Sequence, residues 1–162
     1  MRRDIVQLTL DHLKKYQIER MVLSPKFWSE CKVPVTLNWT VVKYDKTQRN
    51  KLPEKKGIYT FIVKPGIVGH PECAYLLYVG QTEAQNFKKR FTQYFNEERK
   101  PKGREHIKVM ARLWRKHLWY CYAPVDNVTL IEEIENKLIK AFVPPFNRKF
   151  PGVLGKAKGA WS

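Results

Sequence analysis

The stretch GIYTFIVKPGIVGHPECAYLLYVGQTE runs from Gly57 to Glu83 and contains two similar tripeptides. Gly57–Tyr59 reads Gly-Ile-Tyr and Tyr78–Gly80 reads Tyr-Val-Gly, each within a short segment rich in β-branched and aromatic residues. The intervening KPGIVGHPE holds two prolines and two glycines, which is typical of a loop. We therefore predict strands over residues 57–63 and 75–80 that pair as a hairpin. Strand propensity explains either tripeptide alone, so the rest of the chain decides whether the pair has a further purpose.

Helical and strand patterns alternate after the hairpin. The sequence predicts helices at about 86–96, over 104–116 and from Thr129 to about Phe142, where Thr129 and Glu132 have the spacing of a capping box. The segment LWYCYAPV, residues 118–125, is predicted to be a third strand. These elements predict an α+β domain with a small, mainly antiparallel three-stranded sheet flanked by helices.

The composition indicates one domain and a polyanionic partner. The chain has 162 residues, and its 31 Lys and Arg against 15 Asp and Glu give a net charge of +16. Such an excess attracts polyanions, and basic runs such as FKKRF and FNRKF contain interleaved aromatic residues. We predict nucleic acid as the partner in preference to an anionic membrane, because no single basic amphipathic helix dominates. No apolar run is long enough to cross a bilayer.

Cysteine usage indicates a reducing compartment. Cys31, Cys73 and Cys121 are odd in number and far apart, which argues against a disulfide framework. The sequence has no C-x-x-C motif, and its four histidines lack the spacing of metal ligands. We therefore expect a cytoplasmic protein.

The residues before the hairpin form a predicted N-terminal extension of helix and strand. Apolar residues with helical spacing run through 4–21, and a strand is predicted within Val35–Tyr44. We divide the chain into this extension, a main domain and a glycine-rich tail, at residues 1–54, 55–150 and 151–162. The extension is interpreted as a dimerisation arm, as a DNA-contact or specificity element, or as an addition to the sheet.

The residues that follow the hairpin make the pattern specific. Arg90 and Tyr94 are four residues apart and project from one helix face. Glu135 begins the pattern E-x-x-L-I, and Asn147 follows it by twelve residues. In this order, these residues and the two tripeptides resemble the GIY-YIG nuclease superfamily over roughly residues 55–149. Gln81 stands where repair-type members often carry lysine.

The resemblance implies a Mg²⁺-dependent DNA endonuclease, with Mn²⁺ as a substitute ion and double-stranded DNA favoured. It implies that Tyr59 is the general base, that Tyr78 and Tyr94 orient water and phosphate, and that Glu135 binds the metal. The implied catalytic residues are Tyr59, Tyr78, Arg90, Tyr94 and Glu135, and the implied substrate-binding residues are Gly57, Gly80, Gln81, Lys89 and Asn147. Restriction, phage or mobile-element conflict is the expected setting. The alternatives are a structure-specific repair or recombination nuclease and a nucleic-acid-binding protein that does not cut.

Elementary chemistry agrees with these roles. Mg²⁺ accepts one or two carboxylates and keeps other positions for water and phosphate, and the guanidinium of Arg90 offers a planar fork to a phosphate. A phenolate at Tyr59 is expected to be favoured beside Arg90 and a metal. Each residue also has a structural alternative: strand packing for Tyr78, a solvated charge for Arg90, a surface ion pair with lysine for Glu135, and a turn cap for Asn147.

Overall fold

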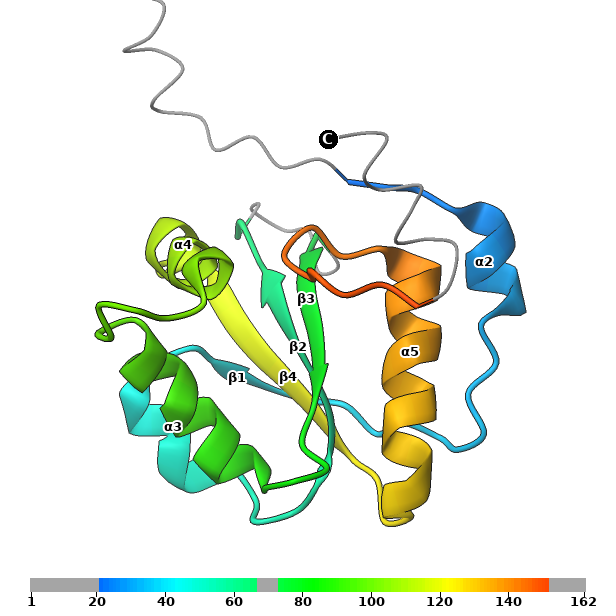
Figure 1. Cartoon of the computed structure of the whole chain (residues 1–162), viewed down its shortest axis with the longest axis horizontal. Helices are drawn as coiled ribbons and strands as arrows, with labels where there is room; N and C mark the ends of the chain where they lie inside the picture. The colour runs from blue at the N-terminus through cyan, green and yellow to red at the C-terminus, as the bar shows by residue number, and fades with distance from the viewer. Residues whose placement is uncertain (1–20, 67–72, 152–162) are drawn as a thin grey trace, which may run out of the picture.

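The computed structural model describes residues 21–66 and 73–151. One sheet forms its centre, built from β1 (Thr40–Lys43), β2 (Gly57–Val63), β3 (Tyr75–Gln81) and β4 (Leu118–Pro124). The strand order is β1-β4-β2-β3, and every neighbouring pair is antiparallel (Figure 1). The α+β class and the β2–β3 hairpin are therefore confirmed.

The predicted number of strands was too low by one. β1 lies within the predicted Val35–Tyr44 segment and pairs with β4, with Thr40 opposite Tyr122 and Lys43 opposite Trp119. Val42, Tyr44 and Leu52 are buried in the same hydrophobic cluster as the main strands. The sequence pattern shows a strand but not its pairing partner, so this long-range contact was missed. Residues 40–43 of the predicted extension thus add a strand to the sheet, and its other predicted roles stay predictions.

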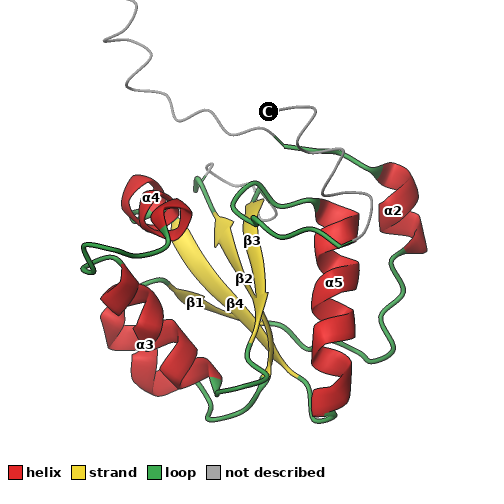
Figure 2. Cartoon of the chain, viewed as in Figure 1, coloured by secondary structure: helices red, strands yellow, loops and turns green. Residues whose placement is uncertain are grey.

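Helices cover both faces of the sheet (Figure 2). On one face lie α3 (Phe87–Glu97) and α4 (Glu105–Trp114); α5 (Ile131–Phe142) covers the other, and α2 (Pro25–Glu30) packs outside α5. Short 3-10 helices occupy Lys46–Lys51 and Val128–Leu130. The predicted helix over 4–21 falls almost wholly outside the described residues, and α2 was not predicted.

Two hydrophobic clusters explain this layering. Tyr59 and Phe61 of β2 pack with residues of α3 and α4, whereas Ile58 packs with Ile131 and Ile134 of α5. Since successive strand residues point to opposite faces, β2 is buried on both sides. This burial accounts for the nearly continuous apolar run GIYTFIV.

Different local features determine where α5 starts and where it ends. The predicted capping box is wrong, because the helix begins at Ile131 without a side-chain cap, and Thr129 Oγ1 instead donates to Asn127 Oδ1 at 2.7 Å. At the other end Val143 adopts φ 43°, a left-handed conformation that strains a β-branched residue, and Pro144-Pro145 prevents the helix from continuing. The chain reverses there and returns to β3, where Phe146 N–H donates to Leu77 C=O at 3.0 Å.

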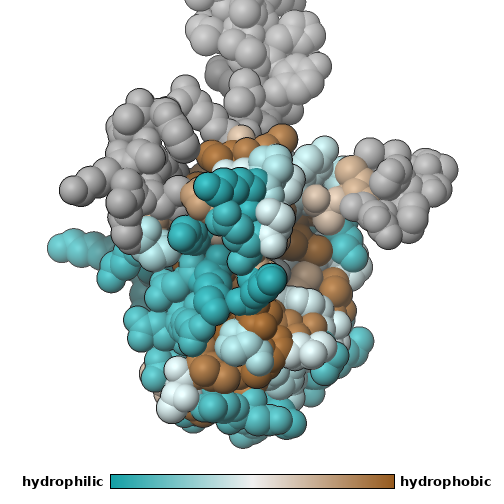
Figure 3. Space-filling view, turned by 90° about the vertical axis from the view of Figure 1, so that its right-hand side faces the viewer, coloured by the Kyte–Doolittle hydropathy of each residue, from teal (hydrophilic) through white to brown (hydrophobic). Residues whose placement is uncertain are grey.

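On the side that carries α2, hydrophobic patches alternate with hydrophilic surface (Figure 3). Trp28 of α2 stacks on Phe142 of α5 with ring centroids 6.4 Å apart, and Lys140 lies 5.3 Å from the ring of Phe27. These contacts hold α2 against α5. Within the described residues no helix has the length and apolar character that a membrane span requires.

Candidate active site

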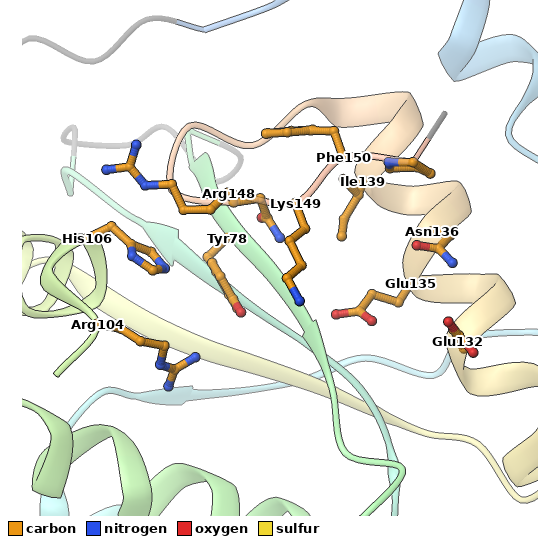
Figure 4. Close-up of a pocket in the computed structure, with 12 residues that line it drawn as sticks. Tyr78, Arg104, His106, Glu132, Glu135, Asn136, Ile139, Arg148, Lys149 and Phe150 are labelled. Atoms are coloured by element: carbon orange, nitrogen blue, oxygen red, sulfur yellow. The ribbon is translucent and has the colours of Figure 1, made fainter. Parts of the chain in front are cut away.

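A cavity of about 500 Å³ lies at the outer edge of β3, between the start of α4 on one face of the sheet and α5 on the other. Its walls come from β3, from the start of α4, from α5 and from the segment after α5 (Figure 4). The lining residues are Tyr78, Arg104, His106, Glu132, Glu135, Asn136, Ile139 and residues 147–151. The side chains of Tyr78, Glu135 and Lys149 point into the same space.

A buried hydrogen-bond network lies beside this cavity. The hydroxyl groups of Tyr59 and Tyr94 are 2.7 Å apart, and Arg90 Nε donates to Tyr59 Oη at 2.9 Å. Tyr78 connects the network to the cavity, since its ring centroid is 6.3 Å from those of both Tyr59 and Tyr94. Residues from β2, β3 and α3 are therefore brought together as predicted, although Tyr59, Arg90 and Tyr94 are not among the residues that line the cavity.

Gly80 is needed because the ring of Tyr59 occupies the space above it. The two residues are partners across β2 and β3, and a Cβ on Gly80 would lie 2.4 Å from both Cζ and Oη of Tyr59. The structure thus gives Gly80 a packing role toward a site residue, and its predicted contact with substrate stays a prediction.

Gly80→Ala is expected to destabilise the protein by about 2 kcal/mol or more, because the methyl group forces the Tyr59 ring out of a close-packed core. It should also break the Tyr59–Arg90 hydrogen bond and reduce any phosphodiesterase activity. Thermal unfolding and cleavage rates measure both effects. Gly66→Ala is the control, since a Cβ there meets nothing within 4 Å and adds only backbone strain. Equal losses for the two variants would contradict the packing argument.

The burial of Tyr59 and Tyr94 bears on the expected phenolate at Tyr59. Tyr59 and Tyr94 are fully buried, and loss of hydration raises the pKa of each phenol despite the nearby guanidinium of Arg90. The phenolate of Tyr59 is therefore disfavoured in the absence of a metal, and its stabilisation by Arg90 together with a metal stays a prediction. Tyr78, which lines the cavity, is the tyrosine placed to contact a bound molecule.

Glu135 lies on the cavity side of α5 and is partly buried. Burial raises the pKa of its carboxyl group to about 7, partly offset by Arg90 and reinforced by Glu132. The lysine pairing suggested by the sequence is made by Glu133, whose carboxylate lies 2.6 Å from Lys137 Nζ. The surface ion-pair alternative for Glu135 is therefore not what the structure contains.

Asn147 bridges the segment after α5 to the edge of β3. Its side-chain oxygen accepts from Val79 N–H and its side-chain nitrogen donates to Val79 C=O, both at 2.9 Å. An amide supplies the donor and acceptor that a neighbouring strand would otherwise provide. The structure gives Asn147 this structural role beside the cavity, in place of the turn cap considered from the sequence.

Asn147→Ala is expected to lower the free energy of unfolding by about 2 kcal/mol, because two buried backbone groups of Val79 lose their partners. Denaturant unfolding measures this loss. The control is Asn136→Ala, since Asn136 also lines the cavity but lies within α5, where alanine favours the helix. A weaker affinity for DNA at unchanged stability would show instead that Asn147 contacts substrate.

Other predicted binding residues lie outside the cavity. Gln81 accepts a hydrogen bond from Glu83 N–H in the turn after β3, and Lys89 is an exposed residue of α3. Gly57 has φ 153°, and a Cβ there would lie 2.2 Å from the Ala123 carbonyl oxygen. Its role is close backbone packing between β2 and β4. The structure therefore does not bring these three residues to the cavity.

The donor set of the cavity fits a hard divalent cation. The described residues contain no cluster of three or more His, Cys, Asp or Glu side chains arranged for a metal. Glu135, Glu132 and the amide of Asn136 nevertheless line one wall together. Mg²⁺ is commonly bound through one or two carboxylates, with water and substrate phosphates completing its shell. This wall supplies that number of carboxylates.

Four basic residues of the cavity were not singled out in the sequence. Arg104 and His106 lie at the start of α4, and Arg148 and Lys149 follow Asn147. They belong to two basic stretches of the chain, EERKPKGREHIK at residues 97–108 and FNRKF at residues 146–150. A charge run does not show which of its members face a site, so only the tertiary structure separates them from other surface cations.

Comparison of the chain with protein-family models, with curated proteins and with solved structures gave no match.

Proposed function

We propose that the protein is a metal-dependent endonuclease that hydrolyses phosphodiester bonds of DNA, as the sequence resemblance to GIY-YIG nucleases implies. The observation that carries this proposal is that Tyr78 connects the buried arginine–tyrosine network to the cavity that Glu135 also lines. The Arg90–Tyr59–Tyr94 network lies directly behind Tyr78, and Tyr78 shares the cavity with Glu135. The net charge of +16 favours a polyanionic substrate.

The cavity has two walls of opposite charge. Glu132 and Glu135 lie on α5, and Arg104, Arg148 and Lys149 lie across from them. A phosphodiester group between these walls would meet cations on one side and the carboxylates on the other. Glu135 and Glu132 would hold Mg²⁺, which when bound stabilises charge on the phosphoryl and leaving oxygens.

We assign the tyrosines different roles from those predicted. Tyr78 is the first choice for the group that accepts a proton from the attacking water, because its side chain reaches the cavity. Tyr59 and Tyr94 fix the position of Arg90 through hydrogen bonding and through ring contacts, with the Arg90 guanidinium carbon 5.9 Å and 5.5 Å from the two ring centroids. The positive charge of Arg90 in turn favours the ionised carboxylate of Glu135, whose pKa it lowers.

Incubation of the purified chain with plasmid DNA tests the proposal. We expect cleavage with Mg²⁺ or Mn²⁺ and none with EDTA, and end-sequencing of the products identifies nicks, double-strand breaks and any preferred site. Branched and damaged duplexes in the same assay test the repair or recombination alternative. Tight DNA binding without cleavage of any substrate would favour the non-cutting module.

A further inference from the structure

Arg104 is the most firmly held cation of the cavity. It is the N-cap residue of α4, and its backbone N–H donates to Glu97 Oε1 at 2.7 Å. This hydrogen bond lowers the pKa of Glu97, so the carboxylate stays charged beside Arg104. The guanidinium carbon of Arg104 lies 5.3 Å from the ring centroid of Tyr94, and Arg104 Nε lies 3.8 Å from Glu97 Oε1. Backbone and side chain are thus both fixed.

The ring of Tyr94 connects Arg104 with the buried network. Arg90 and Arg104 have their guanidinium carbons 5.5 Å and 5.3 Å from the centroid of this ring. Arg90 is tied to Tyr59 through Nε and to Gln93 through Nη1. Arg104 has Glu97 on its Nε side, and its Nη1 and Nη2 form no hydrogen bond within the described part of the chain. These two donors of Arg104, a residue that lines the cavity, are therefore available to a bound molecule.

The remaining basic residues of this wall are held less firmly. Arg148 and Lys149 are exposed, whereas His106 is half-buried and lies between Arg148 and Arg104. Burial lowers the pKa of His106, and Arg148 and Arg104 lower it further. His106 is thus neutral at pH 7, and Arg104 provides the preorganised charge of the wall.

We propose that Arg104 is a phosphate-binding arginine of this site, which contacts a backbone phosphate of the substrate strand other than the phosphate that is cut. This inference rests on the proposed nuclease function. Arg104 is not among the residues that carry the sequence resemblance. Guanidinium geometry matches two phosphate oxygens at once, and a side chain held in place before binding loses little entropy when the complex forms.

Arg112 provides a matched control on the same helix. It is exposed, lies outside the cavity, and has one long contact from Nη2 to the Glu98 carbonyl oxygen at 3.4 Å. Arg104→Gln and Arg112→Gln each remove one positive charge from the same basic protein. The affinity of a short labelled DNA duplex is measured by fluorescence anisotropy in EDTA, over a series of salt concentrations, so that binding is read without cleavage.

Arg104→Gln should weaken binding about tenfold or more, the worth of a hydrogen bond to a charged group. It should also reduce the slope of log affinity against log salt by about 0.9, which corresponds to one phosphate. Arg112→Gln should change affinity by no more than about threefold. Arg104→Lys should keep the salt slope and recover only part of the affinity, since lysine carries the charge without the planar fork.

Equal losses for Arg104→Gln and Arg112→Gln would overturn the proposal, as would full affinity in Arg104→Gln. Thermal unfolding of each variant identifies loss through misfolding. If Arg104→Gln does not fold, Arg104→Lys against Arg112→Lys makes the same comparison, and equal affinities would then overturn it. If the wild-type protein cuts DNA but Arg104→Gln and Arg112→Gln bind it with equal affinity, only the inference about Arg104 fails. A wild-type protein that neither binds nor cuts nucleic acid removes the nuclease function as well.

Discussion

Glu135→Gln is expected to abolish cleavage while leaving DNA bound. The substitution keeps the shape of the side chain but removes the carboxylate that a hard cation needs. Affinity for DNA in EDTA should persist or increase, because a negative charge next to a polyanion is lost. The control is Glu133→Gln, which removes an exposed carboxylate of the same helix that pairs with Lys137. Cleavage at the wild-type rate by Glu135→Gln would contradict the metal assignment.

The raised pKa of Glu135 gives the same variant a stability signature. A carboxyl group with pKa about 7 when folded and 4.5 ordinarily binds more protons in the folded state, so it favours folding at low pH. That stability is lost as pH rises from 4.5 to about 7. Glu135→Gln should therefore be more stable than the wild type above pH 7, by about 1–2 kcal/mol after allowance for partial solvent screening.

Thermal unfolding at about pH 5 and about pH 8 measures this difference, which should be larger at the higher pH. Glu133→Gln should show no such gain. Wild-type cleavage should fall as pH drops, because protons compete with Mg²⁺ for the carboxyl group of Glu135. An unchanged difference in stability between the two pH values would show that the carboxylate of Glu135 is hydrated like that of an exposed residue.

Tyr78→Phe is expected to lower the single-turnover cleavage rate by about 10²-fold or more, the usual contribution of a general base. Only the hydroxyl group that reaches the cavity is lost, so DNA affinity should stay near the wild-type value. Tyr59→Phe should also reduce cleavage, because Arg90 loses its partner at 2.9 Å. It should in addition reduce stability, since a buried hydrogen-bonded hydroxyl is removed.

Tyr120→Phe is the control for both variants. Tyr120 is fully buried and stacks on Tyr59 with centroids 5.2 Å apart, but its hydroxyl has no hydrogen-bond partner within the described structure. Its removal should leave cleavage unchanged and stability unchanged or slightly higher. Wild-type cleavage by Tyr78→Phe together with strong loss in Tyr59→Phe would return the role of general base to Tyr59.

Local patterns in the sequence determined most of the elements. The β-branched and aromatic content of GIYTFIV and YLLYVG predicted β2 and β3, and the loop residues between them predicted the hairpin. Helices α3, α4 and α5 followed from apolar spacing, and α5 ends at Phe142, where its end was predicted. The i, i+4 spacing of Arg90 and Tyr94 placed both on one face of α3. These features depend on neighbours along the chain, so the sequence alone was sufficient.

Only the tertiary structure decided the features that depend on long-range contacts. The pairing of β1 with β4 joins residues far apart in the sequence, and the turn at Val143 brings Asn147 to Val79. Burial determined the chemistry: it raises the pKa of Tyr59 and Glu135, and no sequence pattern shows how completely a side chain is excluded from water. Arg104 became a candidate site residue because the ring of Tyr94 and the carboxylate of Glu97 hold it at the cavity. In the sequence alone, Arg104 does not differ from the other cations of its basic run.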